Sequence, residues 1–299
     1  MDGMWLILAA CSAAFAGLTS ILAKCGLQKV DSTVATALRT AVVVVFSWAI
    51  VAIGGSYTQL PSMSLESWGL LTLSGLMTGA SWLCYFKALQ MGDVNKVVPV
   101  DKSSTVMGIA LAIILLGESV SAIGAAGAAL IFVGTMLMIE KKDVKEIKTE
   151  RHGWLLFALG SAVFAALTSI VGKVGMEGID SNLGTAVRTV VVLAMSWAMV
   201  FVAGKRGAVR GIDRRDATFL ILSGLATGAS WLFFFGALQT GPASIVVPID
   251  KLSILVTVAF SFLVLKEELS KRGAVGLAGI VVGTLLLLVR YRNENGETY

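Results

Sequence analysis

Runs of apolar residues, each about 20 residues long, alternate with short polar breaks along the whole chain. A helix of that length crosses the roughly 30 Å hydrocarbon core of a bilayer. Lipid offers no hydrogen-bond partner to free backbone groups, so each crossing run has to be helical. The pattern predicts ten transmembrane helices, at residues 4–23, 34–53, 67–90, 96–116, 120–139, 153–172, 184–203, 216–239, 245–265 and 272–290.

The second half of the chain repeats the first at a fixed shift of 149 residues. Residues 74–90 recur at 223–239 with thirteen of seventeen positions identical. Each half holds five predicted spans, and an odd number means that the second half enters the membrane in the opposite sense. We therefore expect an all-α membrane protein with ten transmembrane helices in two inverted five-helix repeats. Its expected parts are a first repeat at 1–139, a basic linker at 140–152, a second repeat at 153–292 and a polar tail at 293–299.

The basic residues are distributed as the inversion requires. The break at 54–66 has no Lys or Arg, whereas its equivalent at 203–215 has five. The break at 117–123 also has none, and its equivalent at 266–272 has three. Basic loops mark the cytoplasmic side of a membrane protein. We therefore expect a multi-pass protein of the cell membrane, with the basic loops and the linker in the cytoplasm and both termini outside.

Composition excludes several classes of protein. Charged residues make up 14% of the chain and hydrophobic residues 56%, whereas a soluble domain has roughly 25% charged residues. The net charge of +5 is no sign of nucleic-acid binding, because many basic residues lie in the breaks. The three Cys lack metal-ligand spacing, the single His lies in the linker, and no nucleophile–base motif or phosphate loop is present. No metal, cofactor or enzymatic activity is expected.

Glycine, proline and acidic motifs mark the third, fourth and fifth predicted spans. They are the Gly/Ala/Ser-rich third span that runs into Ala88-Leu89-Gln90, Pro99 at the start of the fourth, Gly117-Glu118 at its end, and Gly124, Gly127 and Gly134 in the fifth. All but Gly117 recur in the second half, and the pattern resembles EamA-type transporters of the drug/metabolite transporter superfamily. The resemblance implies a ten-helix secondary transporter with a central cavity. It also implies cytosolic termini, in conflict with the charge distribution.

The strongest candidates for a substrate site are the paired sequences Pro99-Val100-Asp101-Lys102 and Pro248-Ile249-Asp250-Lys251. A charge at this depth usually faces the bundle interior or a cavity, because hydrocarbon disfavours it. Pro is expected in the first helical turn, where its missing N–H costs least. Adjacent residues point about 100° apart on a helix, so Asp and Lys are expected to pair with other helices rather than with each other. A purely structural role is an equally good interpretation.

Further candidates for substrate contact are Trp82, Tyr85, Lys87, Ser104, Trp231, Phe234 and Ser253. The aromatic residues lie deeper than an interfacial belt, so they favour either a cavity wall or close helix packing. Lys87 replaces a glycine of the other repeat and is a candidate anion contact on one side only.

Candidates for structural charge pairs are Arg39, Arg188, Glu118 and Glu267. The two Arg lie near the starts of the second and seventh predicted spans. They are expected to pair with Asp101 and Asp250, the alternative being that they extend to the interface. The two Glu are expected to be structural acids at helix junctions.

The function that these features favour is secondary transport of a small metabolite by alternating access, amino-acid-like and in the export direction. The expected partners are membrane lipid, a small-molecule substrate and coupling protons, which Asp101 or Asp250 would carry. The alternatives are a lipid-carrier flippase and a non-transporting membrane scaffold.

Overall fold

In a computed structural model of the protein, the described residues are 3–26, 30–91, 94–119, 121–138, 153–263, 266 and 269–294, and these ranges contain helices and no strand. The first half contains α1 (Met4–Gly26), α2 (Ser32–Gly54), the 3₁₀ helix η1 (Ser56–Ser62), α3 (Leu65–Met91), α4 (Val94–Lys102), α5 (Ser104–Leu116) and α6 (Ala122–Met138). The second half contains α7 (Gly153–Gly175), α8 (Ser181–Val202), the 3₁₀ helix η2 (Lys205–Gly211), α9 (Arg214–Thr240), α10 (Ala243–Asp250), α11 (Ser253–Leu263) and α12 (Lys271–Glu294). The predicted linker at 140–152 and Glu267 lie outside the described residues.

Among the described residues, eight stretches are long and apolar enough to cross a membrane. Seven belong to α1, α2, α3, α7, α8, α9 and α12, and the eighth is Ala243–Phe260. The other two predicted spans correspond to shorter helices. Span 96–116 is divided between α4 and α5, and span 120–139 contains the 17-residue α6.

The prediction of unbroken helices at 96–116 and 245–265 is wrong. The chain leaves the helix at Ser103, between α4 and α5, and again at Lys251 and Leu252, between α10 and α11. Both half-helices also begin two residues before the predicted spans, at Val94 and Ala243. Pro248 consequently lies inside α10 instead of in its first turn.

The described helices belong to two compact units. The first unit consists of residues 1–79 and 171–241, and the second of residues 80–170 and 242–299. Because the boundaries fall within α3 and α7, each of these helices contributes a segment to both units.

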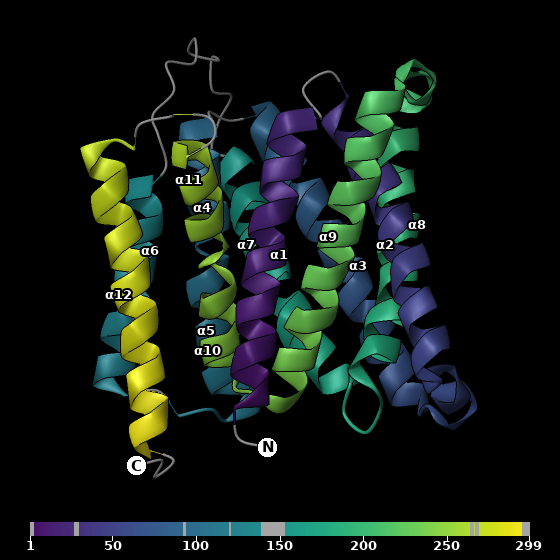
Figure 1. Ribbon diagram of the computed structural model, residues 1–299. Helices are drawn as coiled ribbons and strands as arrows, with labels where there is room; N and C mark the ends of the chain where they lie inside the picture. The colour runs from purple at the N-terminus through teal and green to yellow at the C-terminus, as the bar shows by residue number, and fades with distance from the viewer. Residues whose placement is uncertain are drawn as a thin grey trace. The chain divides into compact units, whose positions relative to one another are not determined.

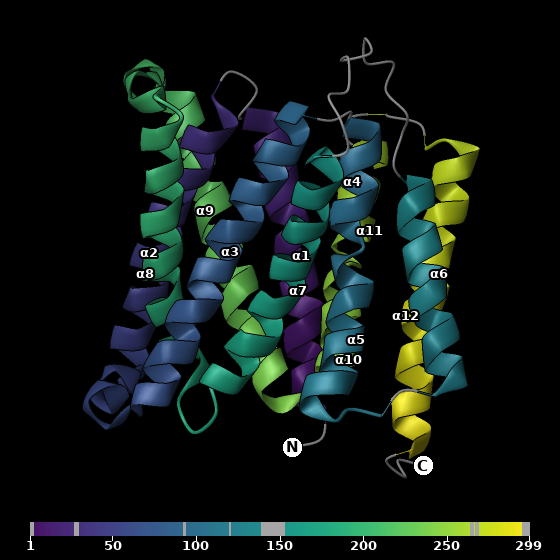
Figure 2. The ribbon, with the colours of Figure 1, turned by 180° about the vertical axis from the view of Figure 1, so that it is seen from behind.

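In the first unit, α2 and its repeat equivalent α8 lie side by side and run antiparallel (Figures 1 and 2). Val34 and Ala37, near the start of α2, pack against Val200, near the end of α8. The 3₁₀ helices lie at opposite ends of this pair. Lys205 of η2 contacts Asp31 at the start of α2, and Gln59 of η1 accepts a hydrogen bond from the backbone N–H of Asp180 at the start of α8.

Equivalent residues begin and end these two helices. The Asp31 carboxylate accepts hydrogen bonds from the backbone N–H groups of Thr33 and Val34, and Asp180 caps α8 in the same way. A side-chain acceptor at this position satisfies N–H groups that have no partner within the helix. Gly55 (φ 73°) and Gly204 (φ 69°) follow the helix ends in the left-handed conformation that glycine adopts readily.

Glycines bring helices of the first unit into close contact in two equivalent places. A Cβ atom added to Gly75 of α3 would lie 2.7 Å from the Cβ atom of Val191 on α8. One added to Gly224 of α9 would lie 2.6 Å from the Cβ atom of Val42 on α2. Val42 and Val191 are also related by 149 residues. The glycine of each repeat therefore packs against the equivalent valine of the other repeat.

The same reciprocity occurs in the second unit, between α6 and α12. A Cβ atom on Gly127 would lie 2.6 Å from the carbonyl oxygen of Gly283, and one on Gly134 would lie 2.5 Å from that of Gly276. Gly276 and Gly283 are the equivalents of Gly127 and Gly134. The crossed pairing makes α6 and α12 antiparallel neighbours, and both ribbon views show them side by side.

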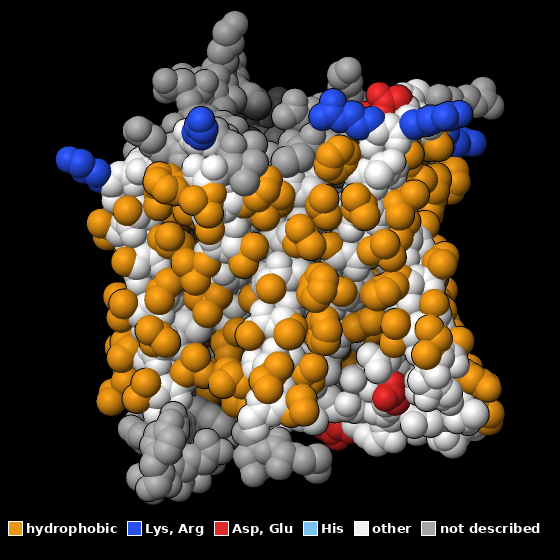
Figure 3. Space-filling view, in the orientation of Figure 1, with side chains coloured by type: hydrophobic (Ala, Val, Ile, Leu, Met, Phe, Trp, Pro, Cys, Tyr) orange, Lys and Arg blue, Asp and Glu red, His pale blue; other side chains and the backbone are white. Residues whose placement is uncertain are grey.

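Many large apolar side chains on the helices are exposed, among them Ile53 (83%), Leu156 (73%) and Val202 (87%). Figure 3 shows that apolar side chains cover the middle of the helices on one face, whereas Lys and Arg lie near helix ends. A water-soluble protein rarely exposes so much apolar surface. The helices are those of a multi-pass membrane protein.

Candidate functional site

The α4–α5 break directly follows Asp101 and Lys102. The backbone N–H of Ser103 donates to the carbonyl of Val100 over 3.1 Å, and the Ser103 hydroxyl donates to the same carbonyl over 2.6 Å. This turn replaces the regular helical hydrogen bonds for one residue. Ser104 then begins α5.

The α10–α11 break has the equivalent position after Asp250. The N–H of Lys251 bonds to the Pro248 carbonyl over 3.0 Å, and that of Leu252 to the Ile249 carbonyl over 2.9 Å. These three-residue spacings are tighter than those of an α-helix. Ser253 begins α11.

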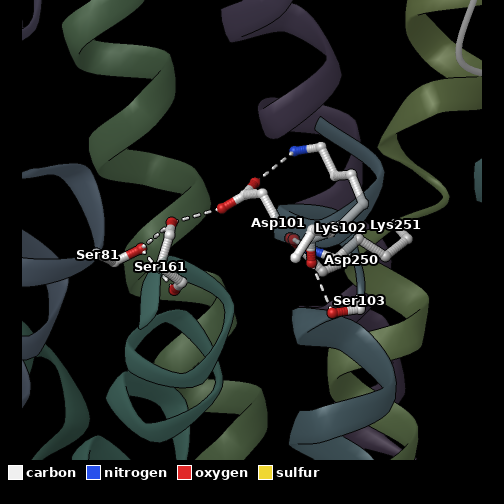
Figure 4. A network of polar contacts seen from close by, with 8 residues as sticks. Ser81, Asp101, Lys102, Ser103, Ser161, Asp250 and Lys251 are labelled. Atoms are coloured by element: carbon white, nitrogen blue, oxygen red, sulfur yellow. Dashed lines mark hydrogen bonds and ion pairs between the residues drawn. The ribbon is translucent and has the colours of Figure 1, made fainter. Parts of the chain in front are cut away.

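Each Asp forms an ion pair with the Lys that follows it (Figure 4). The nitrogen–oxygen distance is 3.8 Å both for Lys102–Asp101 and for Lys251–Asp250. The expectation that adjacent Asp and Lys would not pair with each other is therefore wrong, because the helix ends at this point and the flexible Lys side chain turns back. The Lys102 side chain is 52% exposed and the Asp101 side chain 17%.

Asp101 also contacts a neighbouring helix, as the sequence predicts. The Ser161 hydroxyl of α7 donates to an Asp101 carboxylate oxygen over 2.6 Å. Ser81 of α3 donates to the Ser161 carbonyl over 3.1 Å, and the two serine hydroxyls are 3.3 Å apart. Figure 4 shows this chain of contacts leading from α3 through α7 to the break after α4.

The other candidates of the second unit differ in burial and packing. Tyr85 packs beside Ala88 of α3 and Val97 of α4, next to the break. Trp82, Ser104 and Ser253 are half-buried, and Lys87 is exposed. Whether these side chains contact substrate stays a prediction.

In the first unit, Arg188 is fully buried among hydroxyl groups and aromatic rings. Its Nε donates to Ser74 over 3.2 Å and a terminal nitrogen donates to Thr78 over 2.8 Å. Its guanidinium carbon lies 4.3 Å from the Phe235 ring centroid and 5.5 Å from that of Trp231. Such cation–π contacts stabilise a buried guanidinium. Arg188 is thus enclosed by these side chains, and Trp231 packs against it.

Arg39 makes the equivalent contact in a looser form, since its terminal nitrogen lies 3.5 Å from the hydroxyl of Ser223. Phe234, the remaining aromatic candidate, packs edge-to-face on Phe235 at 5.3 Å. Pairing of Arg39 or Arg188 with Asp101 or Asp250 stays a prediction.

Glu118 lies at a junction between helices of the second unit. Its two carboxylate oxygens accept hydrogen bonds from the backbone N–H groups of Ala243 (2.7 Å) and Ser244 (2.8 Å), at the first turn of α10. A carboxylate is favourable there because a helix N-terminus carries partial positive charge. Glu118 of one repeat therefore holds the start of the half-helix that ends at Asp250 in the other.

A family model for EamA-like transporters matches residues 3–140 and, a second time, residues 152–289. The chain belongs to the EamA-like transporter family. It consists of two tandem EamA units and is a transmembrane transporter.

Other proteins are similar to parts or all of this EamA-like transporter. An uncharacterized transporter encoded in the cobO 3′ region of Sinorhizobium sp. is 46% identical over 138 residues, which are 46% of this chain and 98% of the relative. An uncharacterized protein of Methanocaldococcus jannaschii is 36% identical over 77 residues, or 26% of this chain and 56% of that protein. A protein of known crystal structure matches with a TM-score of 0.81 over the full length of both chains at 16% identity, which shows a shared fold.

Sequence reasoning missed Ser161, although a signal for it was present. Ser12 and Ser161 are repeat equivalents inside otherwise apolar spans. Both are fully buried, and Ser12 lies 3.3 Å from Ser230 just as Ser161 lies 3.3 Å from Ser81. A hydroxyl kept at the same place in both EamA units is a reason to expect a polar partner.

Proposed function

We propose that the protein is a secondary transporter that moves a small metabolite by alternating access. The observation that carries this proposal is that both Asp-Lys pairs lie directly at helix breaks, at equivalent positions of the two repeats. In inverted-repeat transporters, discontinuous helices of this kind supply the substrate and coupling-ion sites near the bilayer midplane.

The reciprocal contacts support an inverted relation between the repeats. In the first unit α2 and α8 are equivalent and antiparallel, and in the second unit α6 and α12 are. A two-fold relation between two repeats produces contacts in matched pairs: where one residue of the first repeat contacts a second residue of the other, the equivalents of both residues are also in contact. Inversion gives two equivalent states of opposite access, which alternating access needs.

The four charges of the two Asp-Lys pairs favour a substrate that carries both signs of charge. A carboxylate of the substrate would compete with Asp for the Lys ammonium group, and an amino group would compete with Lys for the carboxylate. An amino-acid-like metabolite has both groups. We place transport in the export direction across the cell membrane, with protons exchanging on Asp101 or Asp250 as the coupling step.

The test is substrate flux in proteoliposomes by the double variant D101N/D250N. Flux should fall at least about tenfold if each carboxylate makes a charge-assisted hydrogen bond during transport. A matched control is D31N/D180N, which makes the same change at the two equivalent helix N-caps, where Asn is an equally good cap. Normal flux in D101N/D250N, with candidate metabolites that the wild type transports, would overturn the site. A fall in both double variants would point to a general effect of lost charge.

A further inference from the structure

The basic segment around η2 forms a charged surface of the first unit. Arg206, Arg214 and Arg215 are exposed there, and Figure 3 shows Lys and Arg side chains gathered at this end of α8 and α9. The Arg206 guanidinium carbon lies 5.3 Å from the centroid of the Phe201 ring, and that of Arg215 lies 5.9 Å from the Phe219 ring.

Three contacts hold the backbone of this segment in place. Val209 and Ile212 pack against the cluster formed by the start of α2 and the end of α8. Lys205 donates to the Asp31 carboxylate over 2.7 Å. Asp213 accepts a hydrogen bond from the N–H of Asp216 over 2.8 Å and so caps α9. The arginines therefore extend from a fixed support, which lowers the entropy cost of binding a ligand.

The surface around η2 combines basic side chains with exposed apolar side chains. Guanidinium groups bind phosphate oxygens through paired N–H donors, and a ring face keeps the guanidinium in position. Directly beside them, Phe201 is 52% exposed and Val202 87% exposed at the end of a membrane-spanning helix. A ligand that fits has an anionic phosphate joined to apolar chains.

We propose that η2 and the adjoining ends of α8 and α9 bind the headgroup of an anionic phospholipid, with Arg206 and Arg215 on the phosphate and Phe201 and Val202 against an acyl chain. The equivalent segment η1 (Ser56–Ser62) contains no charged residue, so the site exists in one repeat only. The lipid would therefore bind at one face of the membrane. Basic clusters beside a membrane span attract anionic lipids in this way.

The test compares binding of phosphatidylglycerol and phosphatidylcholine to the purified full chain by native mass spectrometry. In R206Q/R215Q, the preference for phosphatidylglycerol should fall about thirtyfold, since each basic residue near an anionic surface contributes about fivefold. The control K271Q/R272Q removes the same charge from two exposed residues at the start of α12. General attraction of basic residues to anionic lipid would make the two double variants lose equally, whereas the proposed site predicts a clearly smaller loss in the control. Thermal unfolding in phosphatidylcholine checks that both variants are folded.

Three results would overturn the proposal. They are an equal loss in the K271Q/R272Q control, a wild type that does not prefer phosphatidylglycerol, and displacement of the lipid by inorganic phosphate at matched ionic strength.

The ring contacts are tested by F201L/F219L, which keeps every charge. Its preference should fall several-fold, as expected for lost cation–π contacts. An unchanged preference would show that the rings do not position the arginines. Since substrate flux does not enter these measurements, their outcome is independent of the proposed transport function.

Discussion

Asp101, next to the break between α4 and α5, has two partners that differ greatly in strength. The Ser161 hydroxyl lies 2.6 Å away, the distance of a charge-assisted O–H···O⁻ hydrogen bond. The Lys102 ammonium lies 3.8 Å away on a half-exposed side chain, and ion pairs of that kind contribute little. Ser161 therefore positions the carboxylate more firmly than Lys102 does.

Replacing Ser161 by Ala should slow transport because Asp101 loses its closest donor. A hydrogen bond to a charged group contributes about 1.5–3 kcal/mol, so a fall in flux of about tenfold or more is expected. The control is S20A, which removes an exposed hydroxyl that bonds only locally, to the Ala16 carbonyl at 3.2 Å. Flux in proteoliposomes measures both variants. Wild-type flux in S161A would show that transport does not need the hydrogen bond from Ser161 to Asp101.

Asp31, which lies outside the membrane spans, makes the stability of the first unit depend on pH. Partial burial opposes its ionisation, but the hydrogen bonds from Lys205 and from the backbone of Val34 and Thr33 outweigh burial and lower its pKa. A carboxyl with a lowered pKa stabilises the fold above its unfolded pKa of about 3.9, and this stabilisation is lost as the pH falls through the folded pKa.

The melting temperature of the wild type should therefore exceed that of D31N by a constant amount above about pH 5, and the difference should shrink as the pH falls below about 4. Asn keeps the helix cap, so the difference reports the Lys205 contact. Thermal unfolding in detergent over this pH range measures it. A difference that grows toward acidic pH would contradict the assignment.

The contacts of the buried charged side chains were the hardest feature to predict from the sequence. The sequence indicates which charges are buried, because Asp101 and Arg188 stand inside apolar runs, but it contains no direct sign of what they contact. The Arg188 guanidinium, for example, contacts Ser74, Thr78 and two aromatic rings, and the sequence analysis predicted none of these partners for it. Residues with hydroxyl groups or aromatic rings are common in these spans, so the sequence does not indicate which of them bind a guanidinium.

At the scale of helices, glycine decides how closely α6 and α12 approach. Gly127 faces the Gly283 carbonyl so closely that an added methyl group would force the helices apart. In G127A we expect a loss of about 1–3 kcal/mol of stability, as in overpacked cores. In G69A, where the structure leaves open space, we expect a gain of about 0.4–1 kcal/mol from the reduced freedom of the unfolded chain. Thermal unfolding compares the two, and equal effects would contradict the close approach.

The positions of helices followed from the sequence, but their interruptions did not. Hydropathy places the spans because burial in lipid depends on the summed apolar surface of a segment. The breaks after Lys102 and Asp250 depend on a few backbone hydrogen bonds, which leave the hydropathy of the segment unchanged. Pro99 and Pro248 were visible, but the helices continue past them for two or more residues. Proline indicates that a helix is weakened but does not locate its end, and a tertiary contact such as that of Glu118 with the first turn of α10 fixes where a half-helix begins.

At the scale of the molecule, inversion makes a prediction that single helices do not. Ser62 and Gly211 are equivalent exposed positions at the ends of η1 and η2. If the repeats are inverted, a Cys at one of them should be labelled by a membrane-impermeant maleimide only from outside, and a Cys at the other only from inside. The positive-inside rule assigns Ser62 to the outside and Gly211, within the basic segment, to the cytoplasm.

Single cysteines S62C and G211C, each in a background without Cys11, Cys25 and Cys84, test this in intact cells and in inside-out vesicles. A side chain at Gly211 meets open space and needs no left-handed backbone, so the substitution should be tolerated. Labelling of both from the same side would exclude inversion and, with it, alternating access by exchange of the two repeats. Opposite labelling with Ser62 inside would keep inversion and reverse the membrane orientation. The termini would then lie in the cytoplasm, and the basic segment at η2 would face outward against the charge rule. The pair of equivalent sites therefore separates the architecture of the transporter from its direction in the membrane, which neither site does alone.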